Sequence, residues 1–139
     1  MTQAELDQLK ARVEADDPDA LFAHARYLAP TDAKESDKFY ELAAQLGHPQ
    51  AAEYIGDKFL ADGDYENALL SFKTGAKAGL LDCSVKIAAM NISVDERSAL
   101  RELEDLAEIG VRSACIALSE YYKAQGNRKQ SSYWRSLLK

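Results

Sequence analysis

The sequence has little of what a disulfide-stabilised, metal-binding or membrane-spanning protein requires. Its 139 residues include two cysteines and two histidines, and none of these lies at the paired spacing of a zinc site. Cys83 and Cys115 lie among apolar and small residues, so we expect buried thiols and no disulfide framework. No apolar run approaches the roughly 18 residues that cross a membrane, and the segment "MTQAELDQLK" lacks the pattern of a signal peptide. We therefore expect a folded cytoplasmic protein without a metal site or membrane contact.

Sequence motifs for catalysis are missing as well. The chain contains no Walker-type phosphate loop, no nucleophile elbow and no His-Glu-x-x-His helix. His24 and His48 have no cysteine or second histidine at ligand spacing. Glu104 and Glu108 share one face of a predicted helix, which is typical of a solvated acidic surface. We expect no enzyme activity, no catalytic residues and no cofactor.

Charge is unevenly distributed along the chain. Residues 1–110 carry 22 acidic and 11 basic side chains, whereas residues 111–139 carry six basic side chains and one acidic residue, Glu120. The net charge of −11 on the first part would repel nucleic acid, which we exclude as a partner. The basic C-terminal part is explained either by ordinary surface asymmetry or by contact with an acidic partner, including the acidic part of a second copy.

Glycine spacing indicates an internal repeat. Gly47, Gly79 and Gly110 each follow a helical run and lie 32 and 31 residues apart. A helix commonly ends at a left-handed residue, a conformation that glycine adopts without a Cβ penalty. Small residues recur eleven positions before and nine positions after these glycines: Ser36, Ala68 and Ala99, then Gly56, Ala88 and Ser119. Large apolar residues recur seven positions before them: Tyr40, Phe72 and Leu103. This pattern predicts helix pairs that approach most closely at small residues.

The sequence predicts an N-terminal helix at about residues 3–15 and four helix pairs. The predicted pairs are 18–29 with 33–46, 49–61 with 65–78, 81–91 with 94–109, and 112–125 with 128–138. Thr2 with Glu5, and Ser93 with Glu96, have the spacing of capping boxes. Gly63-Asp64 and Gly126-Asn127 each combine a left-handed stop with a side-chain cap. We expect one domain, residues 1–139, with an N-terminal helix (1–16) and repeats at about 17–47, 48–79, 80–110 and 111–139.

Two repeat families share features with this pattern. The segment "YIGDKFLADGDYENALLSF" resembles a tetratricopeptide repeat, and the residues on that pattern are Gly56, Phe59, Ala68 and Phe72. "FYELAAQLG" and "YWRSLLK" resemble the Sel-one-like repeat, whose second helix carries an aromatic pair. The chain departs from that family in its short loops and in Asn91 and Arg135, which replace aromatic residues. The resemblance implies an all-α, right-handed α–α superhelix, or solenoid, of about four repeats.

The resemblance also implies a non-catalytic adaptor that binds a protein or peptide on a concave surface formed by the first helix of each repeat. The expected surface positions are Phe22, Arg26, Glu53, Asp57, Val85, Ala89, Ile116 and Glu120. These positions supply carboxylates and apolar groups rather than the lysine-and-asparagine clamp that holds a peptide C-terminus. A basic or amphipathic peptide is therefore the favoured partner.

The C-terminal helix supports an alternative, a self-assembling structural subunit. Tyr133, Trp134 and Leu137 spread over neighbouring faces of one helix, so some apolar surface should remain exposed. Pairing through these residues would produce a weak homodimer. The opposing interpretation is that Trp134 fills the core between the last two helices, and the sequence leaves both open.

Overall fold

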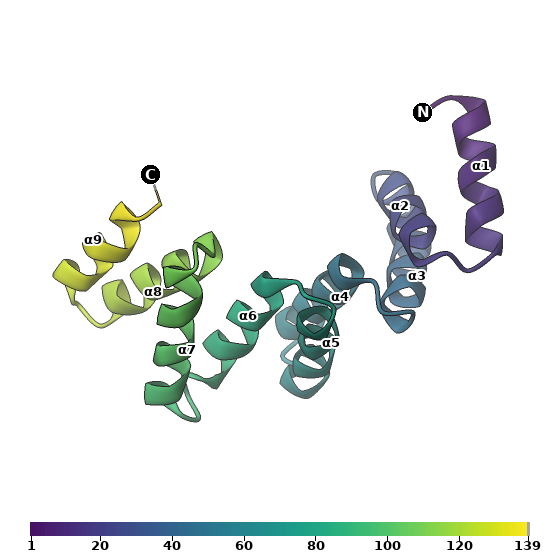
Figure 1. The fold of residues 1–139 in the computed structure, drawn as a ribbon. Helices are drawn as coiled ribbons and strands as arrows, with labels where there is room; N and C mark the ends of the chain where they lie inside the picture. The colour runs from purple at the N-terminus through teal and green to yellow at the C-terminus, as the bar shows by residue number, and fades with distance from the viewer. Residues whose placement is uncertain (139) are drawn as a thin grey trace. The chain divides into compact units, whose positions relative to one another are not determined.

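The computed structural model describes residues 1–138, and those residues form nine α-helices joined by short turns (Figure 1). The helices are α1 (Gln3–Glu14), α2 (Pro18–Leu28), α3 (Ala33–Gln45), α4 (Pro49–Ala61), α5 (Tyr65–Lys77), α6 (Leu81–Asn91), α7 (Glu96–Glu108), α8 (Arg112–Ala124) and α9 (Arg128–Ser136). They pack mainly against their neighbours in the sequence. The protein is therefore all-α, with an arrangement consistent with a helical repeat array. Residue 139, at the end of the fourth predicted repeat, lies outside the described residues.

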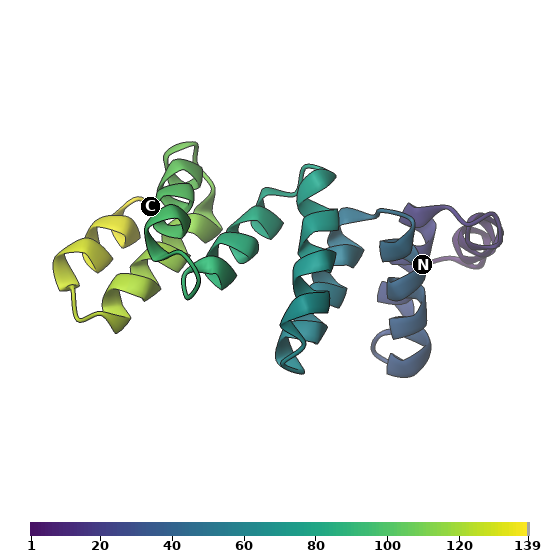
Figure 2. The same ribbon diagram turned by 90° about the horizontal axis from the view of Figure 1, so that it is seen from below.

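Two compact units make up the chain, Met1–Leu80 and Leu81–Lys139. The first holds α1 to α5, with the antiparallel pairs α2–α3 and α4–α5 visible in both views (Figures 1 and 2). The second holds α6 to α9, in which α6 contacts both α7 and α8. The division lies between α5 and α6. No helix of the described chain is both long and apolar enough to cross a bilayer.

Local capping signals determine where most helices begin. Thr2 and Glu5 form the predicted capping box, in which each side chain accepts a hydrogen bond from the other residue's backbone N–H at 3.1 Å. Gly63 has a φ of +77°, and the Asp64 carboxylate accepts a hydrogen bond from the backbone of Asn67 at 3.2 Å. Both predictions are confirmed, as is the equivalent Gly126-Asn127 turn.

The second predicted capping box is wrong. Helix α7 begins at Glu96, and the Asp95 carboxylate accepts the hydrogen bond from the backbone of Ser98 at 3.1 Å. The Ser93 hydroxyl instead donates to the carbonyl of Met90 at the end of α6. Aspartate and serine are about equally good N-caps, so the helix begins two residues later than predicted because Asp95 takes the cap.

The glycines that define the repeat have the predicted conformation. Gly47, Gly79 and Gly110 have φ values of +88°, +97° and +97°. The backbone N–H one residue beyond each glycine bonds a carbonyl five residues earlier, as in the 3.0 Å bond from Leu80 to Gly75. This arrangement satisfies carbonyls at the helix end and turns the chain into the next helix.

Small residues lie where the helices of a pair approach most closely. The Ser36 hydroxyl on α3 donates to the Ala25 carbonyl on α2 at 2.6 Å, and the Ser119 hydroxyl on α8 donates to the Ser131 carbonyl on α9 at 3.0 Å. In the α4–α5 pair, a Cβ atom on Gly56 would lie 2.6 Å from the ring of Phe72. Contact between a short side chain and the opposing backbone requires small residues, which explains the recurrence seen in the sequence.

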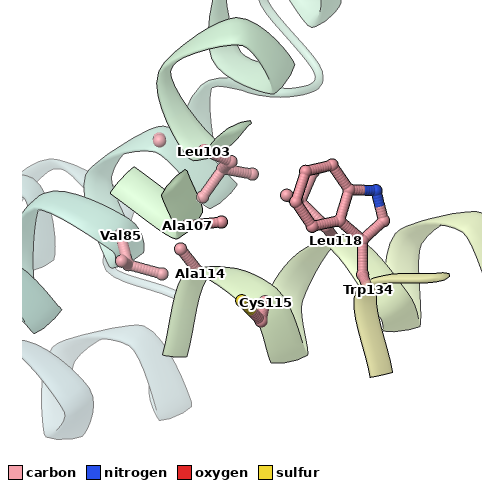
Figure 3. Close-up of a cluster of buried hydrophobic side chains, with 8 residues drawn as sticks. Val85, Leu103, Ala107, Ala114, Cys115, Leu118 and Trp134 are labelled. Atoms are coloured by element: carbon pink, nitrogen blue, oxygen red, sulfur yellow. The ribbon is translucent and has the colours of Figure 1, made fainter. Parts of the chain in front are cut away.

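Each unit has its own apolar core. The core of the first unit contains Leu21, Ala25, Tyr40, Ala43, Ala51 and Ile55. The core of the second unit contains Val85, Ala88, Leu103, Ala107, Ala114, Cys115, Leu118 and Trp134 (Figure 3). Both cysteine side chains are buried, as predicted.

Candidate functional site

The first unit brings four of the predicted surface residues together. Phe22 and Arg26 from α2 lie across from Glu53 and Asp57 from α4, and all four line one hollow of about 330 Å³. We call it the α2–α4 hollow, and its lining residues are Phe22, Arg26, Tyr40, Gln50, Glu53, Tyr54 and Asp57. Tyr40, Gln50 and Tyr54 also line the hollow but were not among the predicted surface residues. Tyr54 follows Glu53 directly and Tyr40 occupies the recurring large apolar position, so only their joint placement needed the structure.

Stacked aromatic rings run along the base of the α2–α4 hollow. Tyr40 and Tyr54 stack with ring centroids 3.9 Å apart, which joins α3 to α4. Phe22 meets Tyr40 edge-on at 5.7 Å and stacks on His48 at 4.3 Å. Such pairs contribute about 0.5–1.5 kcal/mol beyond their buried area. Three rings of this run, Phe22, Tyr40 and Tyr54, line the hollow and are held in a preorganised arrangement.

A carboxylate from α3 holds one end of the aromatic run. Asp37 accepts a hydrogen bond from the Tyr54 hydroxyl at 2.9 Å and pairs with the ammonium of Lys58. The hydrogen bond from Lys58 lowers the pKa of the Asp37 carboxyl, and that from Tyr54 lowers it further. Burial, followed by the bond to Asp37, raises the pKa of Tyr54. The Tyr54 ring is therefore held in place by the Asp37–Lys58 ion pair.

Two rings of the aromatic run, Phe22 and Tyr54, each have a cation nearby. The guanidinium of Arg26 lies 5.8 Å from the centroid of Phe22, and the ammonium of Lys58 lies 5.8 Å from the centroid of Tyr54. Glu53 and Asp57 are four residues apart, so their carboxylates share the face of α4 that lines the hollow. An aromatic base beside carboxylates suits a cation with an apolar stem, such as a lysine or arginine side chain.

His48 supports this arrangement from the interior. Its Nδ1 accepts a hydrogen bond from the backbone of Ala51 at 3.2 Å, which caps α4, and its Nε2 faces the Asp19 carboxylate at 3.2 Å. Burial lowers the pKa of His48, and Asp19 partly opposes that shift. The neutral imidazole with its proton on Nε2 satisfies both contacts. No sequence pattern predicts the stacking of His48 on Phe22, because this contact depends on tertiary packing.

The four predicted surface residues of the second unit differ in exposure. Val85 is 4% exposed and belongs to the core, so its predicted surface position is wrong. It is buried because α6 packs against both α7 and α8. Ala89, Ile116 and Glu120 are exposed, as their predicted positions require.

The three residues predicted to mediate self-association also differ in exposure. Trp134 is 6% exposed and packs in the core with Leu103 and Leu118 (Figure 3). Tyr133 and Leu137 are 53% and 48% exposed. The interpretation of Trp134 as a core residue is therefore the one that its burial favours.

Among residues 1–138, no group of three histidine, cysteine, aspartate or glutamate side chains is arranged to hold a metal ion. No family model matches the chain, and neither the curated proteins nor the solved structures gave a significant match.

Proposed function

We propose that this protein is a non-catalytic interaction adaptor that binds a basic or amphipathic peptide segment of another protein in the α2–α4 hollow. The observation that carries the proposal is the preorganised aromatic base lined by Glu53 and Asp57. Carboxylates steer a basic segment toward the hollow, and the rings supply apolar area for the stem of its side chain. In the second unit, three of the four predicted positions are exposed: Ala89, Ile116 and Glu120.

The expected affinity for a single inserted side chain is low. A cation over an aromatic face contributes about 0.5–2 kcal/mol, and an exposed ion pair contributes about 0–1 kcal/mol. Even without ordering costs, their sum of at most about 3 kcal/mol corresponds to a dissociation constant of about 6 mM or weaker. Tighter binding therefore requires an extended segment that contacts the apolar surface beside the hollow as well.

The proposal includes the repeat architecture that the sequence resembles. We propose that the four helix pairs are Sel-one-like or tetratricopeptide-like repeats of a right-handed superhelix. Support comes from packing in chain order, from left-handed glycines near 32-residue intervals and from small residues at the helix crossings.

Fluorescence anisotropy with two labelled twelve-residue peptides tests the binding proposal. One peptide alternates lysine with leucine, and the other alternates glutamate with leucine. We expect the lysine peptide to bind, with affinity that falls as salt rises, and the glutamate peptide not to bind. Charge reversal in Glu53→Lys/Asp57→Lys should weaken binding at least tenfold while circular dichroism shows unchanged helicity.

Matched variants separate local recognition from bulk charge. Asp7→Lys/Glu14→Lys makes the same change of charge at exposed positions of α1 in the same unit. It should leave most of the affinity intact, and an equal loss in both double variants would refute the α2–α4 hollow as the binding site. Arg26→Gln removes the cation that lies over Phe22, so binding should become about fivefold tighter, corresponding to about 1 kcal/mol.

A second candidate function, self-assembly through the C-terminal repeat, is supported by the exposed Tyr133 and Leu137 side chains. Sedimentation equilibrium over a wide concentration range tests it. A weak homodimer that dissociates in Tyr133→Ser/Leu137→Ser would support this function, and a 15.4 kDa monomer at high concentration would refute it.

A further inference from the structure

A second hollow, of opposite charge, lies at the turn between α8 and α9. Its volume is about 470 Å³, and its lining residues are Lys123, Gly126, Arg128, Ser131, Ser132 and Arg135. Three of these residues are cationic and none is acidic. We call it the α8–α9 basic hollow. Its composition contrasts with the protein as a whole, whose net charge is −6.

The cationic side chains converge on one face. Arg128, Ser132 and Arg135 are spaced i, i+4 and i+7 on α9, which places them along one stripe of the helix, while Lys123 lies in the last turn of α8. Within residues 1–138, no carboxylate forms an ion pair with any of the three cations. No ion pair within the described chain therefore offsets their mutual repulsion, and a bound anion would reduce it.

The register of Arg135 holds large apolar residues in the other three helix pairs. Arg135 follows Leu103 by 32 residues and occupies the register of the buried residues Tyr40 and Phe72. In the first unit, Tyr40 stacks on Tyr54 of the next helix, and Phe72 lies against the Gly56 position of its own pair. In the last pair this register instead carries an exposed arginine.

The position three residues before Arg135 also differs in charge from its equivalent in the first unit. Ser132 corresponds to Asp37, which lies 95 residues earlier and holds the ammonium of Lys58 from the following helix. In the first unit this face presents a carboxylate to a cation. In the last pair the same face presents a serine hydroxyl between two arginines, which suits an incoming anion.

We infer that the α8–α9 basic hollow binds a dianionic phosphate group carried on a side chain of a partner protein. Two guanidinium groups can each bind phosphate oxygens with paired N–H donors, and the lysine ammonium and the Ser132 hydroxyl add further donors. A single carboxylate would neutralise only one of the three positive charges. A nucleic acid strand would need a longer row of cations, whereas residues 1–110 carry a net charge of −11.

The test uses the full chain labelled with ¹⁵N and three probes at constant ionic strength. The probes are a phosphoserine peptide, the same peptide without phosphate, and inorganic phosphate. We expect saturable amide shifts at Gly126 and Ser132 with the phosphoserine peptide, weaker binding of inorganic phosphate at the same amides, and no binding of the unphosphorylated peptide. Arg128→Gln/Arg135→Gln should weaken binding of the phosphopeptide at least tenfold, and Arg128→Lys/Arg135→Lys should recover part of it.

A control pair on α7 tests whether any two arginines suffice. Arg97 and Arg101 line another hollow of the same unit, but there Asp95 and Glu104 accompany them. Arg97→Gln/Arg101→Gln should leave phosphopeptide binding unchanged, and an equal loss would overturn the inference. Inorganic phosphate that binds as tightly as the phosphopeptide, or a ten-nucleotide RNA that binds tighter, would overturn it as well. The outcome is independent of the α2–α4 hollow, because the two tests use different probes and variants.

Discussion

Replacing Gly56 with alanine places one methyl group in the contact between α4 and α5. The added Cβ would lie 2.6 Å from Cε1, 2.7 Å from Cδ1 and 3.0 Å from Cζ of Phe72. Carbon atoms pack favourably at about 3.5–4.0 Å, so the ring or the helix has to move by roughly 1 Å. Phe72 is fully buried, which leaves its ring little room to move.

Two opposing effects determine the size of the change. Alanine is favoured over glycine in a helix interior by about 1 kcal/mol. Overpacking in a buried contact costs about 1–3 kcal/mol, and contact with three ring atoms favours the upper end of that range. We expect Gly56→Ala to lower the free energy of unfolding by about 2 kcal/mol, and Gly56→Leu to lower it further.

Urea unfolding followed by circular dichroism measures this change. With a slope of about 1–3 kcal/mol/M, the midpoint should fall by about 1 M. Phe72→Leu is the matched relief variant, because a smaller side chain leaves room for the methyl group. The double variant should be more stable than the sum of the single effects predicts, by about 1 kcal/mol. An unchanged or higher midpoint in Gly56→Ala would show that helix propensity dominates and would refute the close contact.

Three further predictions concern titrating and buried groups. Burial lowers the pKa of both His24 and His48, so the unfolded chain binds protons first as the pH falls below about 6.5. The free energy of unfolding, measured in urea, should therefore decrease from about pH 7 toward pH 5, with a smaller decrease in His48→Asn; a flat profile would contradict this. The hydrogen bond to Glu96 raises the pKa of Tyr121 to about 12, so Glu96→Gln should lower it in an absorbance titration referenced to Tyr121→Phe. Trp134→Ala should cost about 3–5 kcal/mol in urea unfolding because the indole is in the core, and a near-neutral effect would show that it is peripheral.

Helix positions can be predicted from the sequence because the residues that start and end a helix act locally. Proline at the first turn of α2 and α4, and left-handed glycines at the ends of α3, α5 and α7, act through residues within one helical turn. The start of α7 was misplaced where two good caps, Ser93 and Asp95, lie two residues apart. Their competition depends on small differences in local geometry that spacing alone does not reveal.

Sequence spacing predicts which residues of the candidate site share one exposed helix face. Phe22, Arg26, Glu53 and Asp57 line one hollow, because residues four apart on one helix share a face and the repeat register aligns α2 with α4. The stacking of Tyr40 on Tyr54 was not readable, because it joins rings from two helices whose rotation is set by packing.

The sequence by itself determined the helical class, the repeat period and the small residues at the crossings, because each follows from spacing along one chain. Tertiary structure alone decided that Val85 and Trp134 are buried and that His48 supports Phe22. It also placed Arg128, Ser132 and Arg135 around one hollow with Lys123. Burial and convergence depend on what neighbouring helices place opposite a side chain, and that information is absent from the spacing of residues along a single helix.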